Sequence, residues 1–210
     1  MSYLILVRHG KSEWNKLGLW TGWQDVPLNE DGREEAKKTA GFLQDIPIQK
    51  AYSATLIRVA ETWEIIKNTL KLGNISTVFH KALNERSYGI YTGKNKWQVK
   101  EEVGEAEFVK IRRGWDHPIP EGETLEDVYN RIVPYYQNTI QTDLKNGKNV
   151  IIVACGTSLR ALVKYLENLT INEVCALEIG LAEAHIYEIG ERGQVLSKEI
   201  RAENKSKGKI

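Results

Sequence analysis

The hydrophobic and polar positions of this chain follow two periods, one typical of strands and one typical of helices. Apolar runs at residues 3–7 and 149–154 have the length and polar flanks of buried strands, and a shorter run covers residues 50–53. Elsewhere, apolar residues recur at helical spacing from Glu30, from Thr55, from Thr124 and again beyond Ser158. This alternation predicts an α/β domain in which the strands at 3–7 and 149–154 are neighbours.

Local signals add detail to this pattern. Acidic residues Glu30 and Asp31 suit the first turn of a helix, and Thr124 with Asp127 has the spacing of a capping box. Polar helices are predicted at residues 94–103 and 105–111. The segments 184–189 and 194–200 predict a closing hairpin around the turn at 190–193.

Length and charge limit the classes of function. The 210 residues suffice for one sizeable domain, and a formal net charge of +1 gives no global field for nucleic acid or a membrane surface. The N-terminal apolar run is too short for a signal peptide, and Cys155 and Cys175 lack the spacing of a metal motif. We therefore expect a cytoplasmic protein with a single domain at residues 1–200, a basic flexible tail at 201–210, and no metal.

The first predicted strand opens directly onto a polar loop, Arg8-His9-Gly10-Lys11-Ser12-Glu13-Trp14-Asn15. Open α/β sheets bind ligands at the carboxyl ends of their strands. This loop offers an imidazole, a guanidinium, a hydroxyl and an amide, and a glycine allows backbone N–H groups to approach a ligand closely. Together these groups suit a phosphate.

This loop, preceded by Leu6-Val7 and followed by Trp20-Thr21-Gly22-Trp23, resembles the opening of the histidine phosphatase superfamily. Within that superfamily it resembles the cofactor-dependent phosphoglycerate mutases. Residues 52–62 resemble the family's second phosphate-binding element, and residues 83–89 with Gly93 and Lys96 resemble a mutase signature. The resemblance covers about residues 4–160 and implies a three-layer α/β sandwich, with a mostly parallel central sheet flanked by helices.

The resemblance also implies roles for individual residues. His9 would attack phosphorus and hold the phosphoryl group, and Glu85 would move the proton of the glycerate hydroxyl. The catalytic positions are then His9, Glu85, Arg8, Arg58 and Cys155. The implied substrate-binding positions are Gly10, Lys11, Ser12, Glu13, Trp14, Asn15, Thr21, Gly22, Arg86, Ser87, Tyr88, Lys96, Arg112, Arg113, Gly156 and Thr157.

The implied activity is interconversion of 2- and 3-phosphoglycerate in glycolysis and gluconeogenesis, through a phosphohistidine primed by 2,3-bisphosphoglycerate. The implied partner is a small phosphorylated acid, with no metal, no nucleic acid and no membrane. A homodimer is compatible with the resemblance. In these mutases a basic C-terminal segment covers the occupied site, a role open to residues 201–210.

Cys155 departs from the family pattern, in which a histidine follows the strand matching residues 149–154. A neutral thiol is a weaker donor than an imidazole, so we expect slower transfer, on the order of a hundredfold to a thousandfold. An alternative is that Cys155 is itself a nucleophile, because a strand, a cysteine, a small loop and Arg160 resemble cysteine-dependent phosphatases. The spacing is one residue short of their Cys-x5-Arg loop.

Two further functions stay open. One is a phosphomonoesterase of the same superfamily. The residues against it are the Leu83–Gly89 run, Lys96 and the arginine pair, which suit a substrate that carries a carboxylate. The other is a catalytically inactive homologue that binds phosphoglycerate, which only Cys155 favours.

Overall fold

The computed structural model describes residues 1–202 and 204. Helices and strands alternate through most of this range. In chain order the elements are β1 Ser2–Arg8, α1 Glu13–Lys16, α2 Glu30–Gly41, β2 Lys50–Ser53, α3 Ile57–Thr69, β3 Ser76–Phe79, η1 Lys81–Leu83, η2 Gly89–Tyr91, α4 Lys96–Val103, α5 Glu105–Arg113, α6 Leu125–Tyr135, η3 Tyr136–Ile140, α7 Gln141–Lys145, β4 Val150–Ala154, α8 Gly156–Glu167, α9 Ile171–Ala176, β5 Ala184–Ile189 and β6 Val195–Arg201.

The strands form one sheet with the order β3-β2-β4-β1-β5-β6. Strands β3, β2, β4 and β1 pair in parallel, and β5 runs antiparallel to both β1 and β6. The prediction of a mostly parallel sheet is confirmed, as is the adjacency of the first and fourth strands, where Leu6 pairs with Ile152. The closing hairpin is also confirmed, with a register shift between Glu188 and Ile189.

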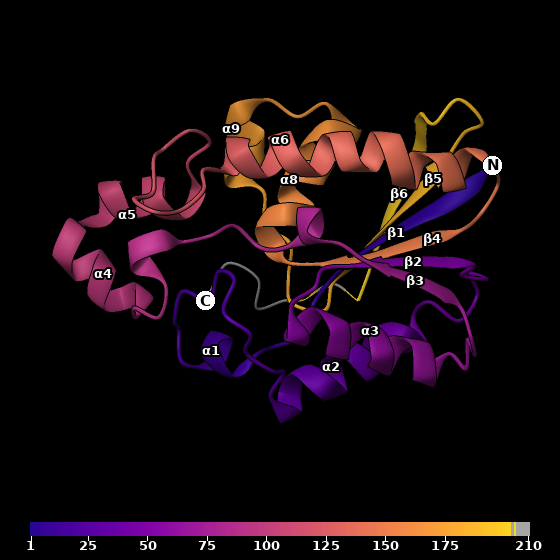
Figure 1. Cartoon of the computed structure of the whole chain (residues 1–210), viewed down its shortest axis with the longest axis horizontal. Coiled ribbons are helices and arrows are strands. Elements are labelled where there is room, and N and C mark those ends of the chain that lie inside the picture. The colour runs from indigo at the N-terminus through magenta and orange to yellow at the C-terminus, as the bar shows by residue number, and fades with distance from the viewer. Residues whose placement is uncertain (203, 205–210) are drawn as a thin grey trace.

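Helices cover both faces of the sheet, so the fold has three layers. Figure 1 shows α6, α8 and α9 above the sheet and α2 and α3 below it. Strand β4 is buried along its whole length, which explains its uninterrupted apolar sequence. The main core joins this strand and β1 to the apolar faces of α3, α6 and α8.

Several elements differ from the sequence predictions. The long helix predicted from Thr124 is α6 followed by the π-helical turn η3 and α7, because Pro134 lies inside α6 and lacks the N–H that a regular helix needs. The second predicted helix begins at Ile57 rather than Thr55. Strand β3, which is partly exposed, and the short helices α1 and α9 were not predicted.

A second, smaller core holds α4 and α5 beyond the end of the sheet, at the left of Figure 1. It contains the buried residues Trp20, Val99, Phe108, Ile111 and Ile119. Trp20 belongs to the loop after α1, so this core ties the α4–α5 pair to that loop. As a result, Lys96 at the start of α4 and Arg113 at the end of α5 face the carboxyl ends of β1 and β4.

Candidate active site

Two adjoining hollows meet at the carboxyl ends of β1 and β4 and share six lining residues, so they form one cleft. The cleft is strongly polar and cationic. Its described lining consists of Arg8, His9, Asn15, Leu19, Trp20, Thr21, Gly22, Arg58, Glu85, Tyr88, Lys96, Arg112, Arg113, Gly156, Thr157, Arg160, Glu178, Ile179, Leu181 and Asn204.

His9 lies at the bottom of the cleft and is 3% exposed. Its Nδ1 is 2.7 Å from the carbonyl oxygen of Gly10. Because a carbonyl only accepts, Nδ1 carries the proton and Nε2 keeps a free lone pair. Burial, Arg58 and Arg8 together hold the pKa of His9 well below its usual range, so the ring is neutral. A neutral imidazole with a free Nε2 is a competent nucleophile.

Arg58 reaches the same point from the first turn of α3, as its position in the sequence predicts. Its guanidinium is buried and donates to the carbonyl oxygens of Gly22 at 2.8 Å and Gln24 at 2.9 Å. It also lies 3.4 Å from the Sγ of Cys155. Burial raises the pKa of the Cys155 thiol to about 11, although Arg58 opposes this shift. The thiol is therefore neutral near pH 7, which argues against Cys155 as a nucleophile.

Three buried donor groups in the cleft have no hydrogen-bond partner among the described residues: Arg8 Nε, Trp20 Nε1 and Thr21 Oγ1. Arg8 Nη1 is held by the carbonyl oxygen of Ile179 at 2.6 Å. Buried polar groups are seldom left unpaired in a folded protein. Three such groups around one cleft suit a ligand rich in hydrogen-bond acceptors.

Glu85 places a carboxylate in this cationic cleft. It is 8% exposed, and its Oε1 accepts the backbone N–H of Arg86 at 2.8 Å. Its Oε2 lies 3.5 Å from the backbone nitrogen of Thr157 at the start of α8. Oε1 is thus held firmly and Oε2 only by a long contact, and Glu85 lines the cleft, which suits a group that exchanges protons with a ligand.

Cations crowd the outer part of the cleft. Burial, Arg112 and Arg8 lower the pKa of Lys96 to about 8. Burial together with Arg160 and Arg112 lowers the pKa of Arg113 to about 9, and burial lowers that of Arg160 to about 10. The groups destabilise one another's charge, so a multiply charged anion would relieve this repulsion.

Other predicted residues lie outside the described cleft lining. The backbone N–H of Gly10 donates to Thr62 Oγ1 at 3.1 Å, and its Cα packs against the backbone of Gly32. The missing side chain of Gly10 therefore allows α2 to pack closely, rather than a ligand to approach. Lys11 pairs with Asp31 at 3.3 Å.

The remaining residues of this set also lie outside the cleft lining. Ser12 caps α1 through Asn15, and Glu13 is exposed on that helix. Arg86 is buried and donates to the carbonyl oxygens of Ile111 and Arg112. The other members are Trp14, which lies against Gly93, Ser87, whose N–H donates to Glu123, and Cys155, which is fully buried.

Part of the cleft lining was not predicted from the sequence. Arg160 was noted only as a possible partner of Cys155, and Glu178, Ile179 and Leu181 were not singled out. Asn204 belongs to the segment 201–210 that was predicted as a flexible tail; Arg201 instead ends β6, and residues 203 and 205–210 lie outside the described residues. The loop before β5 carries no motif, so no sequence signal points to it. Among residues 1–202 and 204, no group of three or more His, Cys, Asp and Glu could hold a metal, and no helix could cross a membrane.

The fold and the cleft define an α/β protein with a neutral histidine in a cationic cleft at the carboxyl ends of parallel strands. The sequence model of the histidine phosphatase superfamily (branch 1) matches residues 4–200, and the chain belongs to this superfamily.

The chain is 40% identical to the 2,3-bisphosphoglycerate-dependent phosphoglycerate mutase of Parvibaculum lavamentivorans, over 97% of this chain and 98% of that protein. It is also 40% identical to the phosphoglycerate mutase of Schizosaccharomyces pombe, over 94% of each chain. Bacillus stearothermophilus YhfR has a similar structure, with a TM-score of 0.80, 25% identity, and coverage of 93% of this chain and 95% of that one.

Proposed function

We propose that this protein interconverts 2- and 3-phosphoglycerate, with His9 as the phosphoryl carrier and 2,3-bisphosphoglycerate as the priming donor. The observation that carries the proposal is a neutral, buried imidazole that shares one cleft with a carboxylate and a cluster of cations. The names of relatives that match nearly the whole chain support it. A role in glycolysis and gluconeogenesis, in the cytoplasm, belongs to the same proposal, as does a homodimer.

The residues present suit 2,3-bisphosphoglycerate. This molecule carries two phosphates, each of about −2 charge near neutral pH, and one carboxylate. The unpartnered donors of Arg8, Trp20 and Thr21 would hold the phosphate at His9. Arg112 and Arg113 would hold the other anionic groups bidentately through their planar guanidinium groups, and Lys96 would add a point charge.

When bound, 2,3-bisphosphoglycerate supplies the phosphoryl group that phosphorylates His9. His9 Nε2 then carries this group, with Arg8 and Arg58 stabilising its negative charge. In transfer to phosphoglycerate, the bond from Nε2 to phosphorus breaks while a substrate hydroxyl oxygen bonds to phosphorus. The Glu85 carboxylate takes the proton of this hydroxyl. When a phosphoryl group passes in the opposite direction, from the ligand to His9, Glu85 returns a proton to the leaving oxygen. Protons and charges balance over one cycle.

One observation favours a weaker activity than in the relatives. The neutral thiol of Cys155 stands where the family resemblance places a histidine, so a strong donor to the phosphoryl group is missing. The expected consequence is slow turnover rather than a different reaction. The cations near Glu85 suit a substrate with a carboxylate, which disfavours a general phosphomonoesterase.

The test is conversion of 3- to 2-phosphoglycerate, with and without 2,3-bisphosphoglycerate, by this protein and by His9→Asn. We expect turnover that depends on 2,3-bisphosphoglycerate and an acid-labile phosphoryl group on the enzyme, both abolished in His9→Asn. Hydrolysis of phosphate monoesters without isomerisation would replace the proposal with the phosphatase function. Phosphoglycerate binding without phosphorylation would support the inactive homologue.

A further inference from the structure

The backbone around Glu85 needs support from side chains. In the described chain, residues 84–88 belong to no helix or strand, so no ladder of backbone hydrogen bonds holds them. The side-chain carboxylate of Glu85 must nevertheless keep a fixed place in the cleft, and errors of about 1 Å in such placement are costly for catalysis.

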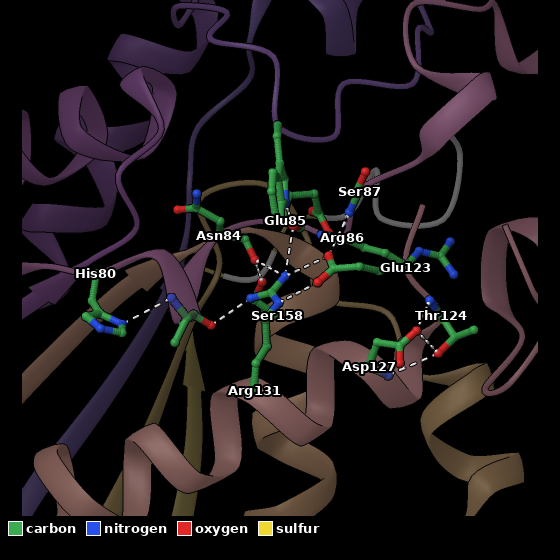
Figure 2. A network of polar contacts seen from close by, with 12 residues as sticks. His80, Asn84, Glu85, Arg86, Ser87, Glu123, Thr124, Asp127, Arg131 and Ser158 are labelled. Atoms are coloured by element: carbon green, nitrogen blue, oxygen red, sulfur yellow. Dashed lines mark hydrogen bonds and ion pairs between the residues drawn. The ribbon is translucent and has the colours of Figure 1, made fainter. Parts of the chain in front are cut away.

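Arg131, on α6, supplies much of this support. Figure 2 shows its side chain pointing from the helix toward the segment that carries Asn84 and Glu85. Its Nη1 donates to the carbonyl oxygen of Ala82 at 2.7 Å, and its Nη2 donates to those of Asn84 and Glu85, each at 2.9 Å. One rigid guanidinium therefore fixes three carbonyl groups on the side of Glu85 that faces away from the cleft.

Glu123 completes the arrangement on the other side of Glu85. Its Oε1 accepts from Arg131 Nε at 2.8 Å and its Oε2 from Nη2 at 3.1 Å, so the pair is bidentate. The same Oε2 accepts the backbone N–H of Ser87 at 2.9 Å, and the N–H of Glu123 donates to the carbonyl oxygen of Ser87. The ion pair thus contacts the chain both before and after Glu85.

The start of α6 places both partners. Thr124 and Asp127 form a capping box that fixes the first turn, directly after Glu123. Arg131 follows on the same helix. The side chain of Arg131 is 21% exposed, and that of Glu123 is 19% exposed. A partly buried, bidentate pair with several backbone acceptors is more ordered than an exposed ion pair.

We propose that Arg131 and Glu123 are positioning residues for Glu85, so that they set the rate of proton transfer without touching substrate. This inference rests on the proposed function, in which Glu85 moves the substrate proton. Without Arg131, three carbonyl groups and one carboxylate lose a charged donor, and the Glu85 segment can shift. We expect kcat for phosphoglycerate to fall by about tenfold to a hundredfold in Arg131→Met, with little change in KM.

The experiment compares two reactions of Arg131→Met and Glu123→Gln. The first is conversion of 3-phosphoglycerate to 2-phosphoglycerate, which needs proton transfer by Glu85. The second is phosphorylation of His9 by p-nitrophenyl phosphate, whose leaving group departs without protonation and so needs no general acid. The inference expects the first rate to fall and the second to stay within about twofold of the parent.

Arg33→Met is the matched control. Arg33 also donates to a carboxylate, that of Glu61, and to a carbonyl oxygen, that of Leu28, but it lies on α2 away from Glu85. We expect its kcat to match that of the parent. If Arg131→Met does not fold, as judged by circular dichroism, Arg131→Lys replaces it, with an expected fall of about tenfold because its ammonium cannot span three carbonyl groups.

Two results would overturn the inference. One is equal loss in both reactions, which indicates general damage to the cleft. The other is a kcat of Arg131→Met and Glu123→Gln equal to that of the Arg33→Met control. Glu85→Gln separates the proposed function from the positioning role, because unimpaired isomerisation in that variant contradicts the proposed function itself. A large loss in Glu85→Gln with no loss in Arg131→Met contradicts the positioning role alone.

Discussion

Replacement of Cys155 by histidine is expected to accelerate phosphoryl transfer. The thiol is neutral, because a pKa of about 11 leaves about one thiol in three thousand ionised at pH 7.5. Its Sγ lies 3.4 Å from Arg58 Nη2, at the end of β4 and beside the strand that leads to His9. The S–H group there is only a weak donor to a bound phosphoryl group.

An imidazole N–H at this position would be a stronger donor. One preorganised donor to a developing charge contributes about 2.7–4 kcal/mol, or a hundredfold to a thousandfold in rate. We expect a new imidazole in this buried place beside Arg58 to be neutral, because burial and a neighbouring cation both disfavour the charged form. A neutral donor is weaker than a charged one, so we expect the lower end of this range, about a hundredfold.

The assay is steady-state isomerisation of 3-phosphoglycerate at saturating 2,3-bisphosphoglycerate, with thermal unfolding to verify that each variant folds. Cys155→Ser is the size-matched control and should gain about severalfold, since a hydroxyl donates better than a thiol. Cys155→Ala should lose activity. If the folded Cys155→His protein shows no rate increase and Cys155→Ala keeps parent-like activity, residue 155 does not contact the phosphoryl group, and the expected role of this position is wrong.

Three more predictions follow from charges, exposure and helix capping. Loss of the Lys96 charge as pH rises through its pKa of about 8 should lower kcat/KM for phosphoglycerate, and Lys96→Arg should remove this limb from the pH profile. A thiol reagent should label half-buried Cys175 in the native protein and reach Cys155 only after unfolding, so native labelling of Cys175→Ser would contradict the burial of Cys155. Thr124→Ala should lower the free energy of unfolding by about 1 kcal/mol in urea titrations, because it removes the cap on the Asp127 N–H; an unchanged midpoint would contradict this role.

Much of the fold could be predicted because its signals are local. The buried strands β1 and β4 are continuous apolar runs, and Thr124 with Asp127 marks the start of α6 within a few residues. Strand β3 lacks such a signal, because its residues are partly exposed at the edge of the sheet. Pro134 could have indicated the end of regular α-helix in the long helix, but apolar spacing continues past it.

The family and the residues of its motifs can be identified from the amino-acid sequence, because both depend on residue types at fixed spacing along the chain. What several of these residues do depends on their surroundings in the folded chain. His9 is neutral because Arg8 and Arg58 meet it in a buried place, and Gly10 serves the packing of α2. Arg131 contacts Ala82, Asn84 and Glu85 across 46 to 49 residues of sequence. Such contacts arise from how α6 packs beside the Glu85 segment, and no local pattern encodes them.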